Sequence, residues 1–281
     1  APAAEPGGRL SEADRQATEC LIDRLRWRRV GKMKRFLVLT KAMTLMHLRN
    51  RSTLFWNLAF PVFLLVIYSQ IFGAMDVGNT GFMTWVVPGI LVLNILAFGL
   101  ISSGTVMVNM REKGVLRRLQ ASPMPAGQLV GSYLLVNVLI ALLQSTIIVV
   151  FAAIVFRTPL TVYGSLWALP MIVLGILTFV ALGQMVSGVA ATAGTAVAIG
   201  QILNFSQMFI TDMIMPMEFM PAWIQKVAPY LPAYAMVQLV RPPLVDGNLG
   251  MALWPNLLVL AGYAIGAGLF AARMFRWAPK A

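Results

Sequence analysis

The sequence predicts an all-α integral membrane protein with six transmembrane helices. Hydrophobic residues make up 59% of the 281 residues, charged residues only 11%, and the mean hydropathy is +0.77, far from the values of soluble domains. One bilayer crossing needs roughly 20 apolar helical residues. The chain supplies six such runs, near residues 54–74, 85–109, 129–156, 164–190, 195–215 and 252–272. A β-barrel strand would alternate apolar and polar residues, and the run 86–100 shows no such alternation.

The positive charges predict that both chain ends lie in the cytoplasm. The arm before the first run holds 12 of the 22 Lys and Arg residues, the connector between the second and third runs holds 4, and the tail from Arg273 holds 3. Basic segments are retained on the cytoplasmic side, so these 19 residues share one side and three lie on the other. The net charge of +12 could indicate nucleic acid, but topology and anionic lipid explain it. We therefore expect a lipid partner and no nucleic acid.

The N-terminal region predicts two segments before the first crossing. Residues 1–33 form a mixed-charge cytoplasmic arm, and no apolar signal-peptide core follows the first residues. Residues 34–52 repeat apolar side chains at helical spacing beside basic ones, which favours an interfacial helix in the headgroup layer. The alternative is a cytoplasmic extension of the first crossing. The apolar positions are Phe36, Leu39, Met43 and Met46.

The connector at residues 110–121 carries the densest charge after the arm. Asn109 and Glu112 have the spacing of a capping box, so a short helix is predicted to start there. Prolines at 123 and 125 would end it. Such a rigid amphipathic helix could dock on a cytoplasmic motor, or it could be a positive loop that only sets topology.

The segment 216–247 contains too many prolines and polar residues for a crossing. Its aromatic side chains favour the outer headgroup layer, where they could anchor the protein or cap an exit. Residues 53–275 would thus form one six-span domain, followed by a cytoplasmic tail at 276–281.

Two stretches resemble the permeases of the ABC-2 type transporter family. The first runs from residue 111 through Ser122-Pro123 to Gly131, and the second from Pro216 to Arg241; the resemblance covers roughly residues 34–275. It implies a bacterial inner-membrane permease that pairs with a second copy or a paralogue and with two separate ATP-binding subunits to export a substrate. Gln120 and Pro125 depart from the family pattern.

The resemblance also assigns residues to roles. The coupling helix that contacts the ATPase would comprise Arg111, Glu112, Lys113, Gly114, Val115, Leu116, Arg117, Arg118 and Leu119. The outer-face motif would comprise Pro221, Trp223, Pro232, Tyr234 and Arg241. In the family, the first, second and fifth spans approach the subunit interface where substrate passes. Polar residues inside these spans are therefore candidates for lining the path. The alternative is that they form ordinary hydrogen bonds between packed helices. These candidates are Asn57, Asn94, Gln201 and Asn204.

The chain carries no recognisable catalytic apparatus. It lacks a G-x-x-x-x-G-K-[ST] phosphate loop, so ATP and Mg²⁺ would bind the partner subunits. We expect no cofactor on this chain. Cys20 and His47 are the only Cys and His, which predicts no metal site and no catalytic residues. A gradient-driven transporter or a channel subunit is the alternative function. The sequence does not separate drugs, lipids and lipid-linked glycans as substrates.

Overall fold

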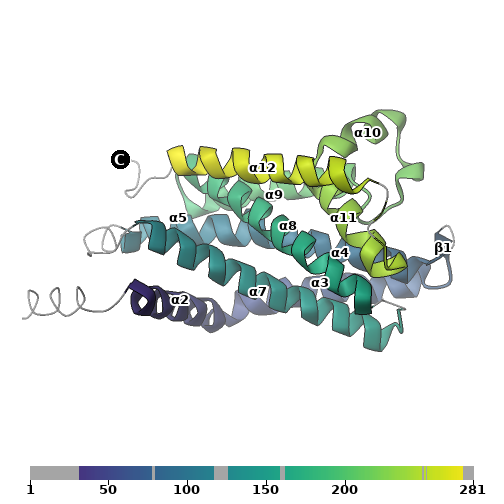
Figure 1. The fold of residues 1–281 in the computed structure, drawn as a ribbon, viewed down its shortest axis with the longest axis horizontal. Helices are drawn as coiled ribbons and strands as arrows, with labels where there is room; N and C mark the ends of the chain where they lie inside the picture. The colour runs from purple at the N-terminus through teal and green to yellow at the C-terminus, as the bar shows by residue number, and fades with distance from the viewer. Residues whose placement is uncertain are drawn as a thin grey trace, which may run out of the picture.

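Long helices lying side by side build most of the described chain (Figure 1). The structure is a computed structural model, and it describes residues 32–77, 80–116, 126–158, 162–248, 250 and 252–274. Within these residues the only sheet is a hairpin of β1 (Asp76–Val77) and β2 (Thr80–Gly81), which pair antiparallel. The N-terminal arm and the C-terminal tail predicted from the sequence lie outside the described residues.

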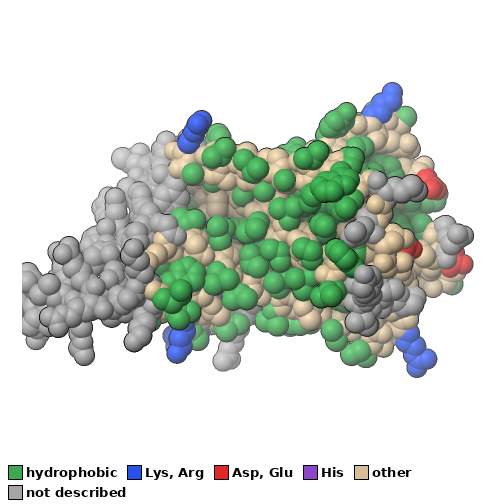
Figure 2. All heavy atoms as spheres, viewed as in Figure 1, with side chains coloured by type: hydrophobic (Ala, Val, Ile, Leu, Met, Phe, Trp, Pro, Cys, Tyr) green, Lys and Arg blue, Asp and Glu red, His purple; other side chains and the backbone are tan. Residues whose placement is uncertain are grey.

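Six helical segments of this structure are long and apolar enough to cross a membrane, which confirms the predicted fold class. The second is a composite of α4, a π-helical stretch η1 and α5, and it runs without a break from Phe82 to Glu112. The helices are α3 (Arg51–Phe72), α4 (Phe82–Ala97), η1 (Phe98–Ser103), α5 (Gly104–Glu112), α7 (Ala126–Val155), α8 (Val162–Val189), α9 (Ala193–Ile210) and α12 (Leu253–Met274). Figure 2 shows hydrophobic side chains across one flank and charged ones near its two ends, as expected for a membrane belt.

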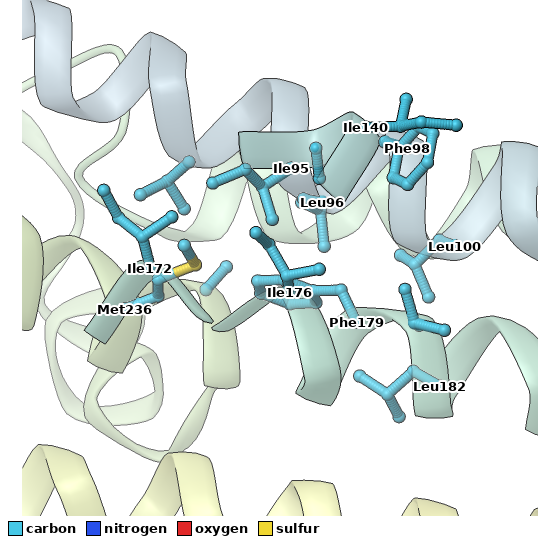
Figure 3. Packing of buried hydrophobic residues seen from close by; sticks show 14 of the residues in the cluster. Ile95, Leu96, Phe98, Leu100, Ile140, Ile172, Ile176, Phe179, Leu182 and Met236 are labelled. Carbon is cyan, nitrogen blue, oxygen red and sulfur yellow. The ribbon is translucent and has the colours of Figure 1, made fainter. Parts of the chain in front are cut away.

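The second span occupies the centre of the bundle. In its most apolar stretch 83% of the residues are buried. The corresponding shares are 11% in the first span and 17% in the fifth, so these two spans lie at the periphery. Ile95, Leu96 and Leu100 of this span pack against Ile176 and Phe179 of α8 (Figure 3). The close-packed core is thus built around α4, η1 and α5.

The predicted start of the connector helix is wrong. Asn109 lies inside α5, which ends at Glu112, and Gly114 adopts the left-handed conformation (φ +67°) that terminates helices. The second span runs past its predicted limit at residue 109, and Met110 and Arg111 beyond that limit are still buried. Residues 117–125, which include the second part of the predicted connector helix, lie outside the described residues.

Helix α2 (Lys32–Arg49) precedes the first span, from which Asn50 separates it. It packs on α7 and buries Leu39 and Met43, two of the four apolar positions predicted to share a face. Met46, by contrast, is exposed. The interfacial location of this helix stays a prediction.

Four short helices fill the segment between the fifth and sixth spans. They are η2 (Met217–Phe219), α10 (Ala222–Val227), η3 (Ala228–Tyr230) and α11 (Pro232–Asp246). Phe219, Trp223 and Tyr230 are exposed, as expected for headgroup-level aromatics. Helix α11 differs, since it packs against α4, α8 and α12 and contributes Met236 to the core. Its 15 residues are too few to cross a bilayer, yet they are apolar enough to be buried within the bundle.

Small residues bring the second span close to its neighbours. A Cβ added to Gly183 of α8 would lie 2.0 Å from the carbonyl oxygen of Gly99 in η1, and one added to Gly200 of α9 would lie 3.2 Å from that of Leu100. Gly262 and Gly266 of α12 meet no atom within 4 Å, although their small-xxx-small spacing is typical of helix packing. Gly183 and Gly200 therefore let the fourth and fifth spans approach the backbone of the central span.

Replacing Gly183 by Ala should destabilise the protein, because a backbone carbonyl cannot give way to the added methyl group. We expect a cost of roughly 1–3 kcal/mol, the usual range for overpacking, seen as a lower melting temperature in detergent. Gly262→Ala, which adds the same methyl group in open space, is the matched control. Equal melting temperatures for the two variants would contradict the predicted contact.

Candidate functional site

A groove between the first, second and fifth spans contains all four residues predicted to line a path. Asn57 of α3, Asn94 of α4 and both Gln201 and Asn204 of α9 line a hollow of about 320 Å³. The remaining lining is mainly apolar and aromatic, with Trp56, Phe60, Pro61, Leu93, Ala97, Ile101, Ser102, Phe205 and Met208. Concave sites with few polar groups among apolar ones are typical of ligand binding.

Hydrogen bonds orient the polar groups on the first and second spans. The Asn94 side-chain amide donates to the backbone carbonyl of Asn57 (2.7 Å), and the Asn57 amide donates to the Ser102 hydroxyl (3.3 Å). A carbonyl can only accept, so the Asn94 nitrogen must face Asn57. The Oδ1 atoms of Asn94 and Asn204 are buried and have no hydrogen-bond partner among the described residues. These two acceptors are therefore not exposed to the hollow.

A second hollow of about 490 Å³ continues the groove toward the connector. It shares Trp56, Asn57, Ile101 and Ser102 with the first. Its other lining residues are Met46, His47, Asn50, Phe98, Thr105, Val106, Asn109, Met110, Lys113, Val115 and Val197. Sequence reasoning did not find this hollow, although polar residues at the ends of three neighbouring helices were a usable signal. We call the two parts the path hollow and the connector hollow.

The side chains of Arg111 and Glu112 hold the turn between the fourth and fifth spans. Arg111 is 5% exposed, and its guanidinium donates to the carbonyls of Ser187 (3.1 Å) and Ala190 at the end of α8. The carboxylate of Glu112 accepts the backbone N–H of Ala193, the first residue of α9 (3.0 Å). A cation at a helix C-terminus and an anion at an N-terminus both complement the helix dipole. We call this arrangement the inner clasp.

The inner clasp changes the interpretation of the predicted coupling residues. The side chain of Arg111 is used inside the chain, and Leu116 is buried in the core at 1% exposure. Glu112 and Lys113 are exposed, and Val115 is half-buried. The predicted members Arg117, Arg118 and Leu119 lie outside the described residues. Contact with another subunit is therefore open to Glu112, Lys113 and the undescribed part of the connector, but not to the Arg111 guanidinium.

A second polar cluster lies at the opposite ends of the second and fifth spans. The Arg241 guanidinium donates to the Asp212 carboxylate (2.6 Å) and to the Trp85 carbonyl (3.2 Å), and its carbon lies 4.1 Å from the Trp85 ring centroid. Burial lowers the pKa of Arg241, and the nearby Asp212 charge opposes that shift. Gln238 donates to the same carboxylate (3.0 Å). This outer clasp links α4, α9 and α11.

The predicted outer-face motif divides between surface and core. Pro221 caps α10, and Trp223 on that helix is 61% exposed. Pro232 begins α11 and is buried, Tyr234 is half-buried, and Arg241 belongs to the outer clasp. No three His, Cys, Asp or Glu side chains group closely enough to hold a metal ion within the described part of the chain.

Comparison with known sequences places this architecture in a family. The profile described as "ABC-2 type transporter" matches residues 34–244, and the chain therefore belongs to that family. Over 220 residues, 77% of this chain and 86% of the relative, it is 24% identical to the "Putative transport permease YvfS" of Bacillus subtilis. The "Putative transport permease ycf38" of Cyanophora paradoxa is 24% identical over 218 residues, 74% of this chain and 73% of the relative.

A third relative is longer than the region it shares. The "Probable multidrug ABC transporter permease YbhR" of Escherichia coli is 23% identical over 202 residues, which cover 70% of this chain and 54% of the relative. The match thus spans about half of that protein. The family and these relatives support a multi-pass membrane transport permease.

Replacing Arg111 by Ala should destabilise the chain, since the carbonyls at the end of α8 would be left buried without their donor. We expect about 1–3 kcal/mol for each unsatisfied buried group, measured as a fall in the detergent melting temperature. The matched control is Arg273→Ala, because Arg273 is exposed on α12. If both variants had the same melting temperature, Arg111 would have no structural role. Its side chain could then contact the ATPase, as the resemblance implies.

Proposed function

We propose that this ABC-2 family member is the permease subunit of an exporter driven by ATP hydrolysis on separate subunits, which bind the ATP and Mg²⁺. The groove is the observation that carries the proposal. Its path hollow brings Asn57, Asn94, Gln201 and Asn204 together from three spans, and its connector hollow reaches Lys113 at the start of the charged connector. A transport path and the segment expected to contact the motor are thus adjacent in space.

The inner clasp supports a route for the motion. A push on the connector would act on the end of α5, where Arg111 and Glu112 bond the turn between α8 and α9. The fifth span would follow the second, because both ends of α9 are bonded near the second span's ends. The first span has few buried residues and would separate from them. The path hollow lies where that separation occurs.

The exposed faces of the first and fifth spans favour a second permease as partner. Phe55, Phe60 and Phe63 on α3 and Ile202 and Phe209 on α9 are each at least half exposed. Either lipid or another permease, a second copy or a paralogue, would cover them. In this arrangement the ends of the chain and the connector face the cytoplasm of a bacterial cell, as the distribution of basic residues predicts.

A gradient-driven transporter or channel remains the second candidate function. A proton or cation pathway usually places ionisable residues inside the membrane. The ion pair of Arg241 and Asp212 is the only one among the described residues, and it lies at the outer end of the fifth span. In the part of the chain that the structure describes, Lys113 supplies the only charge that lines either hollow. These positions favour the ATP-driven function.

The first test is affinity purification from native membranes, with mass spectrometry of the proteins that co-purify. An ATPase with a phosphate loop should accompany the wild-type chain, and Arg117→Glu with Arg118→Glu should reduce its recovery because the connector charge is reversed. The variant should still insert, measured as unchanged yield in the membrane fraction. Recovery of an intact wild-type complex without an ATPase would favour gradient-driven transport, and unchanged recovery in the variant would refute docking through these arginines.

A second test addresses the path hollow. Gln201→Trp should lower transport in reconstituted vesicles severalfold or more, because the larger ring fills space between α3, α4 and α9. Ile202→Trp is the matched control, since Ile202 is the next residue, is 67% exposed and does not line the hollow. Transport that fell equally in both variants, or in neither, would count against this path.

A further inference from the structure

We propose that the connector hollow binds the negatively charged headgroup of an amphiphile from the adjacent membrane leaflet, and that the hydrocarbon part of this molecule lies in the apolar part of the groove. The inference deepens the proposed function by naming a substrate class, and it rests on that function where it calls the occupant a substrate. The binding itself requires only this chain.

The lining of the connector hollow is divided in the way that an amphiphile requires. The polar lining residues are His47, Asn50, Asn57, Ser102, Thr105, Asn109 and Lys113. The apolar ones include Trp56, Ile101 and Val197, of which Trp56 and Ile101 also line the path hollow. Apolar lining therefore runs from the headgroup end into the path hollow, where Phe60, Phe205 and Met208 extend it.

The charge of the hollow selects an anionic headgroup. Among the described residues, Lys113 is the only charged one that lines either hollow, and its ammonium group forms no ion pair with any of them. The neighbouring Glu112 carboxylate is bonded to the start of α9. A basic side chain near a membrane surface attracts an anionic lipid by an amount equivalent to about fivefold in affinity. A cationic amphiphile would meet only this repulsive charge.

Side-chain amides of the hollow can hydrogen-bond a headgroup. Asn57 and Asn109 line the hollow, and each neutral amide offers both a donor and an acceptor. Phosphate oxygens accept from such donors, and headgroup hydroxyl groups both donate and accept.

The side of the groove is open to the membrane. Trp56 is 65% exposed and Val197 36% exposed, on the first and fifth spans respectively. An amphiphile could enter between these spans without leaving the bilayer, with its charged end remaining near the connector. This geometry favours an amphiphile over a small soluble anion.

The binding test uses the purified full-length chain in uncharged detergent without any ATPase, so a role of Lys113 in docking cannot affect the result. The probes are dihexanoyl phosphatidylglycerol, dihexanoyl phosphatidylcholine and glycerol 3-phosphate, and bound molecules are counted by native mass spectrometry. We expect the phosphatidylglycerol to bind about fivefold more tightly than the phosphatidylcholine, and glycerol 3-phosphate to bind far more weakly than either lipid.

Three variants locate the binding. Lys113→Glu should remove the preference for phosphatidylglycerol, whereas Lys226→Glu, a charge reversal at an exposed position on α10, should leave it unchanged. Val197→Trp, which fills the apolar side of the hollow and keeps Lys113, should weaken both lipids. Size-exclusion profiles and melting temperatures check that each variant is folded.

Equal affinities for the two lipids, or a preference that survives Lys113→Glu, would overturn the proposal. Binding of glycerol 3-phosphate as tight as that of the lipid would replace the amphiphile with a small anion and would also overturn it. Neither result bears on the ATPase partner, which is tested separately by the co-purification experiment. Failure of that experiment with intact lipid binding would instead leave an anionic-amphiphile site on a permease of another kind.

Discussion

The Arg111 guanidinium is the contact on which the inner end of the bundle depends. A buried charge without partners costs roughly several kcal/mol, and here carbonyl groups at the end of α8 accept from both terminal nitrogens of the guanidinium. Because the next residue, Glu112, caps α9, one helix end determines both where the fourth span stops and where the fifth begins. The chain therefore reverses direction against the second span and not in a free loop.

The outer clasp gives the fifth span a second attachment of the same kind. Asp212 follows α9 directly and bonds Arg241, which also bonds the backbone near the start of α4. Between these two attachments, Gly200 lets α9 approach the backbone of the second span closely. The first span has no comparable ties, since its described polar contacts to the second are those of Asn57. The first span is therefore attached to the second span more weakly than the fifth span is. The groove lies along this weaker contact.

The sequence predicted the six spans well because hydropathy over about 20 residues is a local property. Polarity inside apolar spans singled out Asn57, Asn94, Gln201 and Asn204. The resemblance to the family grouped them, because it implies that the first, second and fifth spans lie together, and in the structure all four line one hollow. The inner clasp could not be predicted, because its partners lie 76 to 81 residues away in the chain. Glu112 does cap a helix, but spacing could not reveal that the helix is α9 and not the connector.

The first residues of the connector show why its function cannot be reduced to one contact. Arg111 bonds the end of α8, Glu112 the start of α9, Lys113 lines the connector hollow, and Leu116 enters the core. The left-handed turn at Gly114 ends α5, so these directions diverge within one turn of chain. Under the proposed function, a ligand at Lys113 and an ATPase subunit on the connector would consequently act on the same short segment. Coupling between the groove and the ATPase then needs no long pathway, since the ligand and the ATPase would each bias the position of the end of α5.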